Sequence, residues 1–390
     1  MKKTLLLLCF LLCIKTSFGQ QIELSNEAKI SVLTIGPGNS LNDAFGHNAF
    51  RIKDESLNLD KTYDYGLFNF STPYFYLKFA TGKLNYSLGK SDYYDLLSYY
   101  IRQDRTVKEQ VLNLSQLEKQ RLYNFLVNNY KPENREYLYE FFFDNCATKI
   151  KDVTKIALND NITFNEPKGF KHETFRTLIH NNLNKNSWGS LGIDVALGSV
   201  IDRKATPEQH MFLPEFIYKF FENATIKTNN EPLVKESKIL FQQKNRVKPT
   251  SFFTSPLFVF GFVGLLILYI TYNDRKNEKR STWLDVVLFS ITGIVGVFIL
   301  LLWFATDHTG THQNYNLLWA FALNLLVIPQ LLKKKPSNWF VKYLKLLVIL
   351  LCLMTLHWLI GVQVFAIGLI PLLIALFIRY VYLIKYFNVK

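Results

Sequence analysis

The last third of the chain consists mainly of long apolar runs, and no other feature limits the possible folds as strongly. A helix needs about 20 apolar residues to cross the hydrocarbon core of a bilayer, which is about 30 Å thick. The runs predict five transmembrane helices, at residues 256–272, 283–304, 317–332, 344–360 and 362–382. We therefore expect residues 251–390 to form a transmembrane helical domain.

The basic residues of this region predict its orientation. Lys and Arg gather in the loops after the first and third runs and in the tail with Arg379, Lys385 and Lys390, whereas residues 305–316 contain neither. Loops rich in Lys and Arg stay in the cytoplasm. We therefore expect a cytoplasmic C-terminus and an external 305–316 loop.

The first 19 residues have the pattern of a secretory signal peptide. Met1-Lys2-Lys3 precedes an apolar run over residues 5–14, and Ser17-Phe18-Gly19 supplies small residues for cleavage. Residues 20–250 are then expected to be an exported domain of a multi-pass protein of the bacterial inner membrane. The net charge of +14 does not indicate a nucleic-acid partner, because an exported domain does not meet nucleic acid.

The cysteines single out one residue of the exported domain. Of four Cys, Cys9 and Cys13 lie in the leader and Cys352 lies in an apolar run, which leaves Cys146. An unpaired Cys in an exported domain suggests a reactive thiol or an intermolecular bridge. A small buried apolar residue is the simpler alternative.

The residues around Cys146 predict a helix that begins at this position. Asp144 or Asn145 is suited to the N-cap, and the apolar residues that follow recur on one helical face: Cys146, Ile150, Val153, Ile156 and Ala157. A thiol in a first turn has its thiolate stabilised by the helix dipole. The aromatic run 141–143 before it suggests a buried strand or a partner surface.

Three strands are predicted before this helix, at residues 29–35, 47–52 and 62–70. His47 opens the second strand after Gly46, and it is the candidate general base for Cys146. Asp64 or Asn69 on the third strand is the candidate group that orients His47. Arg51, on the same strand as His47, and Asn145 are candidate substrate contacts.

The rest of the exported domain is less distinctive. Residues 71–88 are dense in aromatics, which fits either a core hairpin or helix or an aromatic surface at the membrane interface or along an acyl-chain groove. Residues 91–130 suggest helices, residues 191–216 irregular backbone near the site, and residues 227–248 a connection to the first transmembrane run.

Two resemblances refine this interpretation. The order Gly-His, then Asn-Cys at a helix start, resembles the circularly permuted papain-like (NlpC/P60-type) arrangement, and Asn145-Cys146 is similar to the pair in lecithin:retinol acyltransferase-like enzymes. After the Cys the latter carry an acidic residue and His, where this chain has Ala147 and Thr148. An α+β fold is implied, with a papain-like exported domain followed by the transmembrane bundle.

A closer resemblance covers most of the chain. Gly36-Pro37-Gly38, Phe45-Gly46-His47, the 65–70 strand, Phe143-Asp144-Asn145-Cys146 and the C-terminal runs together look like the Lnb-type lipoprotein N-acyltransferase family. This resemblance implies transfer of an acyl chain from a glyceryl ester to the α-amine of a lipoprotein N-terminal Cys. The donor that the resemblance implies is the lipoprotein's own diacylglyceryl group, and the sequence leaves a phospholipid donor open. The expected partners are therefore diacylglyceryl lipoproteins or phospholipid and membrane lipids, without a cofactor.

A second polar cluster occupies the external loop after the second run. His308 and His312 have a spacing compatible with zinc on a helix, but Gly310 lies between them and no Glu intervenes. We expect no metal, and expect His308, His312 and Asn314 to contact the substrate.

Functions of other classes remain open from the sequence. They are a membrane-anchored cysteine peptidase or amidase, a phospholipid acylhydrolase, and a non-catalytic envelope assembly protein. Five membrane spans favour a lipidic substrate over cell wall.

Overall fold

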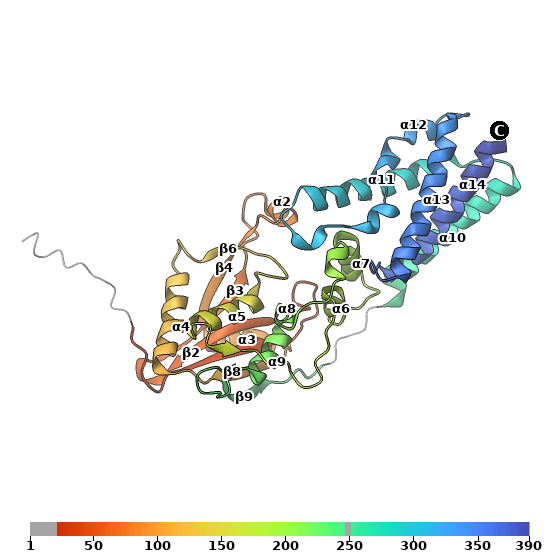
Figure 1. Ribbon diagram of the computed structural model, residues 1–390. Helices are drawn as coiled ribbons and strands as arrows, with labels where there is room; N and C mark the ends of the chain where they lie inside the picture. The colour runs from red at the N-terminus through yellow and green to blue at the C-terminus, as the bar shows by residue number, and fades with distance from the viewer. Residues whose placement is uncertain (1–21, 246–250, 390) are drawn as a thin grey trace, which may run out of the picture.

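The computed structural model describes residues 22–245 and 251–389. The predicted signal peptide, residues 1–19, lies outside the described residues. Figure 1 shows a sheet-containing N-terminal domain joined to an elongated bundle of helices. This is the α+β domain followed by a helical membrane region that the sequence predicted.

An antiparallel sheet of seven strands, in the order β6-β4-β3-β2-β1-β5-β9, forms the centre of the N-terminal domain. Its strands are β1 (Lys29–Ile35), β2 (His47–Asp54), β3 (Leu59–Leu67), β4 (Asn85–Asp92), β5 (Val107–Leu112), β6 (Glu136–Leu138) and β9 (Val234–Phe241). A small second sheet pairs β7 (Ile162–Thr163) with β8 (Thr225–Ile226).

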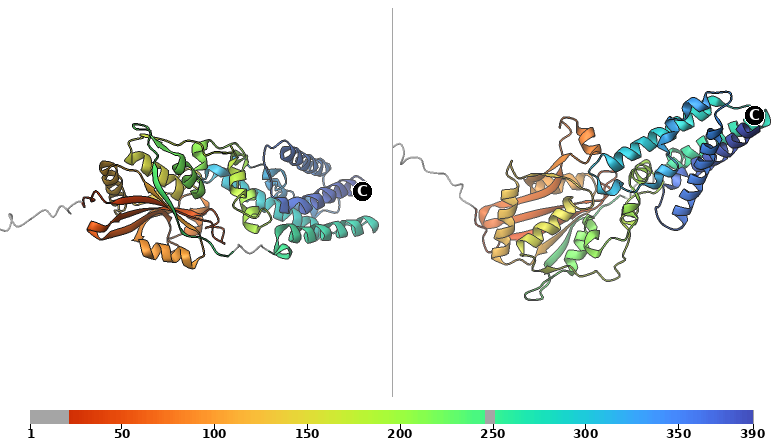
Figure 2. Two further views of the ribbon diagram at one scale, coloured as in Figure 1. Left: turned by 90° about the horizontal axis from the view of Figure 1, so that it is seen from below. Right: turned by 45° about the horizontal axis from the view of Figure 1, so that its top comes forward.

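Helices cover both faces of the large sheet, which Figure 2 shows from below. The helices of this domain are α2 (Phe75–Ala80), α3 (Tyr93–Arg102), α4 (Gln116–Asn129), α5 (Cys146–Ala157), α6 (Phe175–His180), α7 (Trp188–Ala196), α8 (Pro207–His210) and α9 (Pro214–Asn223), with 3-10 turns η1 (Glu55–Leu57) and η2 (Ser199–Ile201).

The two faces follow from the alternation of side chains along a strand. On one face Val32 and Phe50 pack with Ile150 of α5 and Leu122 of α4. On the other face Leu33 and Ala49 pack with residues of α3. The core helix α5 is thereby fixed across β2 and β3.

Several predicted elements are confirmed and others are wrong. The strands at 29–35 and 47–52 and the helix from Cys146 are present. The segment 91–130, predicted helical, contains strand β5, and the predicted connection 227–248 contains the edge strand β9. Strand β9 faces solvent over most of its length, so it carries no apolar alternation that would reveal it.

The aromatic run 141–143 is a turn rather than a strand. Phe142 is buried between Phe175, which its ring meets edge-on, and Phe212, which it meets at a tilt. The run therefore anchors the start of α5 against the α6 region instead of joining a sheet.

The C-terminal region has four helices long and apolar enough to cross a membrane among the described residues, not five. Its elements are η3 (Phe252–Thr254), α10 (Pro256–Lys276), α11 (Thr282–Phe304), η4 (Thr309–Thr311), η5 (Tyr315–Leu318), η6 (Ala322–Leu325), α12 (Ile328–Leu331), α13 (Asn338–Leu359), η7 (Ile367–Leu369) and α14 (Ile370–Val389). Helix α14 also begins later than predicted, because residues 362–366 form a loop.

The predicted third helix, 317–332, is replaced by the short turns η5, η6 and α12. They run along α11, where a Cβ on Gly296 would lie 2.1 Å from the Ala320 carbonyl oxygen. Asn324 Nδ2 donates to Thr292 Oγ1 of α11 at 2.8 Å. Irregular backbone at membrane depth requires such protein partners in place of lipid. The segment therefore lies along α11 as an extended series of turns.

Arg379 was assigned to a basic tail, and this is wrong. It lies within α14, fully buried, and pairs with Asp285 of α11 and Asp274 of α10, each at 2.7 Å. The three helices are held together at one end of the bundle by this buried ion cluster.

Candidate active site

Cys146 is the first residue of α5, and its position depends on the cap formed by Asn145. The Asn145 side-chain oxygen accepts from the amides of Ala147 and Thr148, both at 2.9 Å, and Thr148 completes a capping box. The amide of Cys146 takes no part in these bonds. It is therefore the first-turn amide suited to an oxyanion beside the sulfur.

His47 opens β2 next to this helix start. Gly46 precedes it with φ of +85°, and a Cβ there would lie 2.6 Å from the Ile35 carbonyl oxygen, so only Gly fits the turn. Pairing of β2 with β3 begins only at Phe50. The backbone amide of Asn48 is thus available to donate a hydrogen bond to the Cys146 sulfur.

Strand β3 supplies the third group. His47 Nε2 lies 3.3 Å from Asp64 Oδ2, a long hydrogen bond in which the imidazole N–H donates. Asn69 lies beyond the end of β3, exposed, and its side chain accepts from the amide of Ser71 at 2.9 Å. The structure thus brings Asp64, and not Asn69, to His47.

The three groups favour a charged pair. Burial by itself would raise the pKa of the Cys146 thiol, but the neighbouring His47 and hydrogen bonds from His47 and the Asn48 amide lower it. Burial by itself would lower the pKa of His47, but the neighbouring Cys146 sulfur and the hydrogen bonds with Asp64 and Cys146 hold it well above its usual range. A thiolate next to an imidazolium is the form of the site that these surroundings stabilise.

The site is enclosed but not sealed. The side chains of His47 and Asp64 are 16% and 11% exposed, and Cys146 is partly exposed. The ring of Tyr100 of α3 lies tilted beside His47, with ring centroids 6.3 Å apart, and its phenol pKa is raised by burial. Neither Tyr100 nor the Asn48 amide could be recognised from the sequence, since neither belongs to a motif with the Cys or the His.

Arg51 does not belong to this site. Its guanidinium is buried, forms two bonds with Asp60 at 2.7 and 2.8 Å, bonds Glu109 at 3.0 Å and lies over the ring of Tyr93. The structure thus directs Arg51 to the carboxylates of Asp60 and Glu109 rather than to Cys146, and its contact with a substrate stays a prediction.

Asn145 is also structural. It is 3% exposed, and its Nδ2 donates to the carbonyls of Phe141 and Phe212, both at 2.8 Å. With the two amide bonds of the cap, each polar atom of the side chain has its partners. No group remains for a substrate.

The 305–316 loop with the two His contacts the N-terminal domain close to α5. His308 Nε2 lies 2.9 Å from the Phe79 carbonyl oxygen, and Thr309 Oγ1 donates to Glu140 Oε1 at 2.7 Å. The other oxygen of Glu140 accepts from the amides of Phe142 and Phe143 in the turn that leads to Cys146. The loop therefore supports the turn before the site.

The remaining residues of this loop are not arranged as a ligand site. Asn314 is fully buried, and its Nδ2 donates to the carbonyls of Val195 and Ala196. The structure places it between the loop and α7, and its contact with a substrate stays a prediction. His312 is exposed and lies against Gly198 through its carbonyl. Within the described parts of the chain, no group of three or more His, Cys, Asp or Glu could hold a metal ion.

A second set of contacts joins the two parts of the chain. Buried Arg176 pairs with Asp194 at 2.7 Å and with Asp202 at 2.9 Å. Asp202 also accepts from the amide of Val364 in the loop between α13 and α14, and Asp194 presents its carbonyl to Asn316. The bonds of Asp202 to Val364 and of Asp194 to Asn316 fix the N-terminal domain relative to the bundle.

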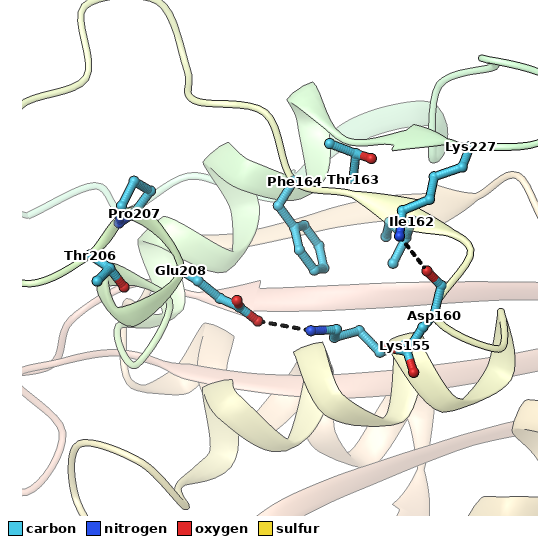
Figure 3. Close-up of a pocket in the computed structure, with 9 residues that line it drawn as sticks. All are labelled: Lys155, Asp160, Ile162, Thr163, Phe164, Thr206, Pro207, Glu208 and Lys227. Carbon is cyan, nitrogen blue, oxygen red and sulfur yellow. Dashed lines mark hydrogen bonds and ion pairs between the residues drawn. The ribbon is translucent and has the colours of Figure 1, made fainter.

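One surface hollow lies away from Cys146. A pocket of about 520 Å³ opens beside the C-terminal half of α5, with Lys155 paired to Glu208 and Lys227 donating to the Asp160 carbonyl (Figure 3). The lysines of this pocket are already engaged by the protein. We therefore place no chemistry there.

Two family models match the chain. The Lnb N-terminal periplasmic domain matches residues 19–181, and the Lnb transmembrane domain matches residues 248–389. The chain belongs to the Lnb family. No match was found among curated proteins or solved structures. The two matches confirm the family resemblance, and His47, Asp64 and Cys146 all lie within the match to the periplasmic domain. The permuted papain-like topology stays a prediction.

Proposed function

We propose that this protein is a lipoprotein N-acyltransferase that uses Cys146 as a nucleophile. It moves an acyl chain from a glyceryl ester to the α-amine of a lipoprotein N-terminal Cys. The observation that carries the proposal is the alignment of Cys146, His47 and Asp64 at a helix start, with the surroundings favouring the thiolate. Family membership and a periplasmic domain held against a membrane bundle support a lipid substrate.

The first half of the reaction forms a thioester. The Cys146 thiolate attacks the ester carbonyl carbon, and the resulting oxyanion is placed to accept a hydrogen bond from the Cys146 amide. When the C–O bond breaks, the glyceryl oxygen leaves with the proton of the His47 imidazolium. The enzyme then carries the acyl group on sulfur, and His47 is neutral.

The second half returns the site to its starting state. The neutral α-amine attacks the thioester carbonyl and transfers a proton to His47, while the C–S bond breaks and the thiolate is released. Asp64 keeps the imidazole oriented and stabilises its cation through both halves. No oxidant, metal or cofactor enters the balance.

The membrane region suits this reaction because both substrates keep their acyl chains in a bilayer. We infer that the N-terminal domain and the 305–316 loop are periplasmic and that the C-terminus is cytoplasmic in the inner membrane, from the Lys and Arg of the loops. The test is a reporter enzyme that works only outside the cytoplasm, fused after residue 390. Activity of this reporter would contradict the orientation.

The test uses purified full-length protein and a diacylglyceryl lipopeptide whose α-amine is blocked. Without an acceptor amine the acyl-enzyme accumulates, so Cys146 gains the mass of one fatty acid, and neutral hydroxylamine removes it. Cys146→Ser and His47→Ala abolish transfer to an unblocked lipopeptide. Cys352→Ser is the matched control, because that exposed thiol lies on α13, and it keeps full activity.

Two results would overturn the proposal. Turnover of the unblocked substrate without any adduct from the blocked one indicates direct attack by the amine. Release of free fatty acid without N-acylated product indicates an acylhydrolase. Isotope label placed either in the lipopeptide or in added phospholipid identifies the donor.

A further inference from the structure

An apolar segment on the surface of the N-terminal domain has no protein partner that explains it. Between β3 and β4 the chain exposes Tyr76 by 78%, Leu77 by 63% and Phe79 by 54%, and no residue of α2 is buried. The full set of large apolar side chains exposed there is Leu67, Phe68, Phe70, Tyr74, Tyr76, Leu77 and Phe79. Patches of this size on a soluble domain mark an interaction surface.

This aromatic segment, residues 67–80, is attached to the end of a membrane helix. The amide of Asp307 donates to the Thr81 carbonyl at 3.0 Å, and His308 bonds the Phe79 carbonyl. Asp307 follows α11 closely, and α11 ends with the stacked rings of Trp303 and Phe304. Figure 1 shows α2 beside this end of α11.

The composition of the segment fits the boundary between lipid and water. Tyr rings place an apolar body in lipid and a hydroxyl in the headgroup layer, where aromatic residues gather at the ends of membrane helices. Lys78 within α2 and Lys83 after it have long stems that reach headgroups from an apolar setting.

We propose that residues 67–80 insert into the interface of the bilayer leaflet that faces the N-terminal domain. The occupant of this apolar surface is membrane lipid, since the hydrogen bonds to residues 307 and 308 hold it at the depth where α11 leaves the membrane. This inference concerns membrane contact and does not depend on acyl transfer.

The segment also leads directly to the candidate site. It begins one residue after Gly66, and a Cβ on Gly66 would lie 3.7 Å from Cys146 Cβ. An inserted segment therefore brings the lipid interface close to the thiol along a single stretch of backbone.

The test measures the depth of a spin label in the full-length protein. With all native Cys replaced by Ser, single labels are placed at Leu77→Cys and, as the matched control, at Leu117→Cys, which is 68% exposed on α4. The protein is reconstituted, one copy per disc, in nanodiscs of phosphatidylcholine and phosphatidylglycerol. Power saturation compares collisions with oxygen, which dissolves in lipid, and with a water-soluble nickel chelate.

The expected result is a ratio of oxygen to nickel accessibility several-fold higher at Leu77 than at Leu117. A second label at Tyr76→Cys is expected to give the same result, so that one poorly folded variant does not decide the outcome. Equal, water-like ratios at positions 77 and 117 would overturn the proposal. So would a label at 77 that neither reagent reaches, since this indicates that protein covers the surface.

Discussion

Replacing Asn145 by Ala is expected to destabilise the N-terminal domain more than the loss of an ordinary helix cap. The change removes two hydrogen bonds to the amides of Ala147 and Thr148 and two to the carbonyls of Phe141 and Phe212. An N-cap contributes about 1 kcal/mol to the free energy of unfolding. Each of the two further buried bonds contributes about 1 kcal/mol.

The expected loss is therefore about 3 kcal/mol. For a domain of this size that corresponds to a fall in the unfolding midpoint of roughly 6–12 °C. The assay is thermal unfolding of the full chain in detergent micelles at a fixed scan rate. Ser115→Ala is the matched control, because Ser115 caps α4 with the same capping-box geometry but is exposed and bonds only the helix. Its expected loss is about 1 kcal/mol.

Equal shifts for Asn145→Ala and Ser115→Ala would refute the reasoning. The buried bonds to Phe141 and Phe212 would then contribute nothing measurable. If Asn145→Ala also lost acyl transfer without losing stability, Asn145 would be a substrate contact, as the sequence suggested.

Two further predictions follow from the site and the bundle. In a Cys146→Ser background, Asp64→Asn lowers the pKa of His47, because it removes a hydrogen bond that raises this pKa. NMR titration of labelled imidazole measures the pKa, and Asn69→Ala should leave it unchanged. An unshifted pKa of His47 in Asp64→Asn would contradict the role of Asp64. With a lower pKa, the His47 imidazolium loses its proton at a lower pH. The pH range in which the imidazole is charged therefore ends earlier on its alkaline side. Gly296→Val should destabilise the bundle by several kcal/mol or block insertion, because its Cβ meets the Ala320 carbonyl. A Cβ at Gly261 meets nothing within 4 Å, so Gly261→Val should be tolerated. Equal yields of folded protein from the two variants would show that the turns along α11 can move away.

The sequence was a good guide where a local pattern has one physical solution. The helix at Cys146 follows from a capping residue and a 3.6-residue apolar period, and β1 and β2 follow from their composition and turns. The four long membrane helices follow from length and hydropathy. The third apolar run has the same composition, but its Asn side chains and the glycines of α11 allow close packing as turns, and composition cannot distinguish the two.

Some features of the candidate site could be predicted from the sequence, and others depend on the tertiary structure. That Cys146 is an unpaired thiol at a helix start, and that His47 follows a Gly turn, could be read from the chain. Which polar residues are free for chemistry could not, because that depends on partners distant in sequence. Arg51 is hydrogen-bonded to Asp60 and Glu109, and the Asn314 side chain donates to carbonyls of α7. The tertiary structure also distinguishes Asp64 from Asn69. Asp64 lies on β3, where its carboxylate reaches the imidazole, whereas the strand ends before Asn69.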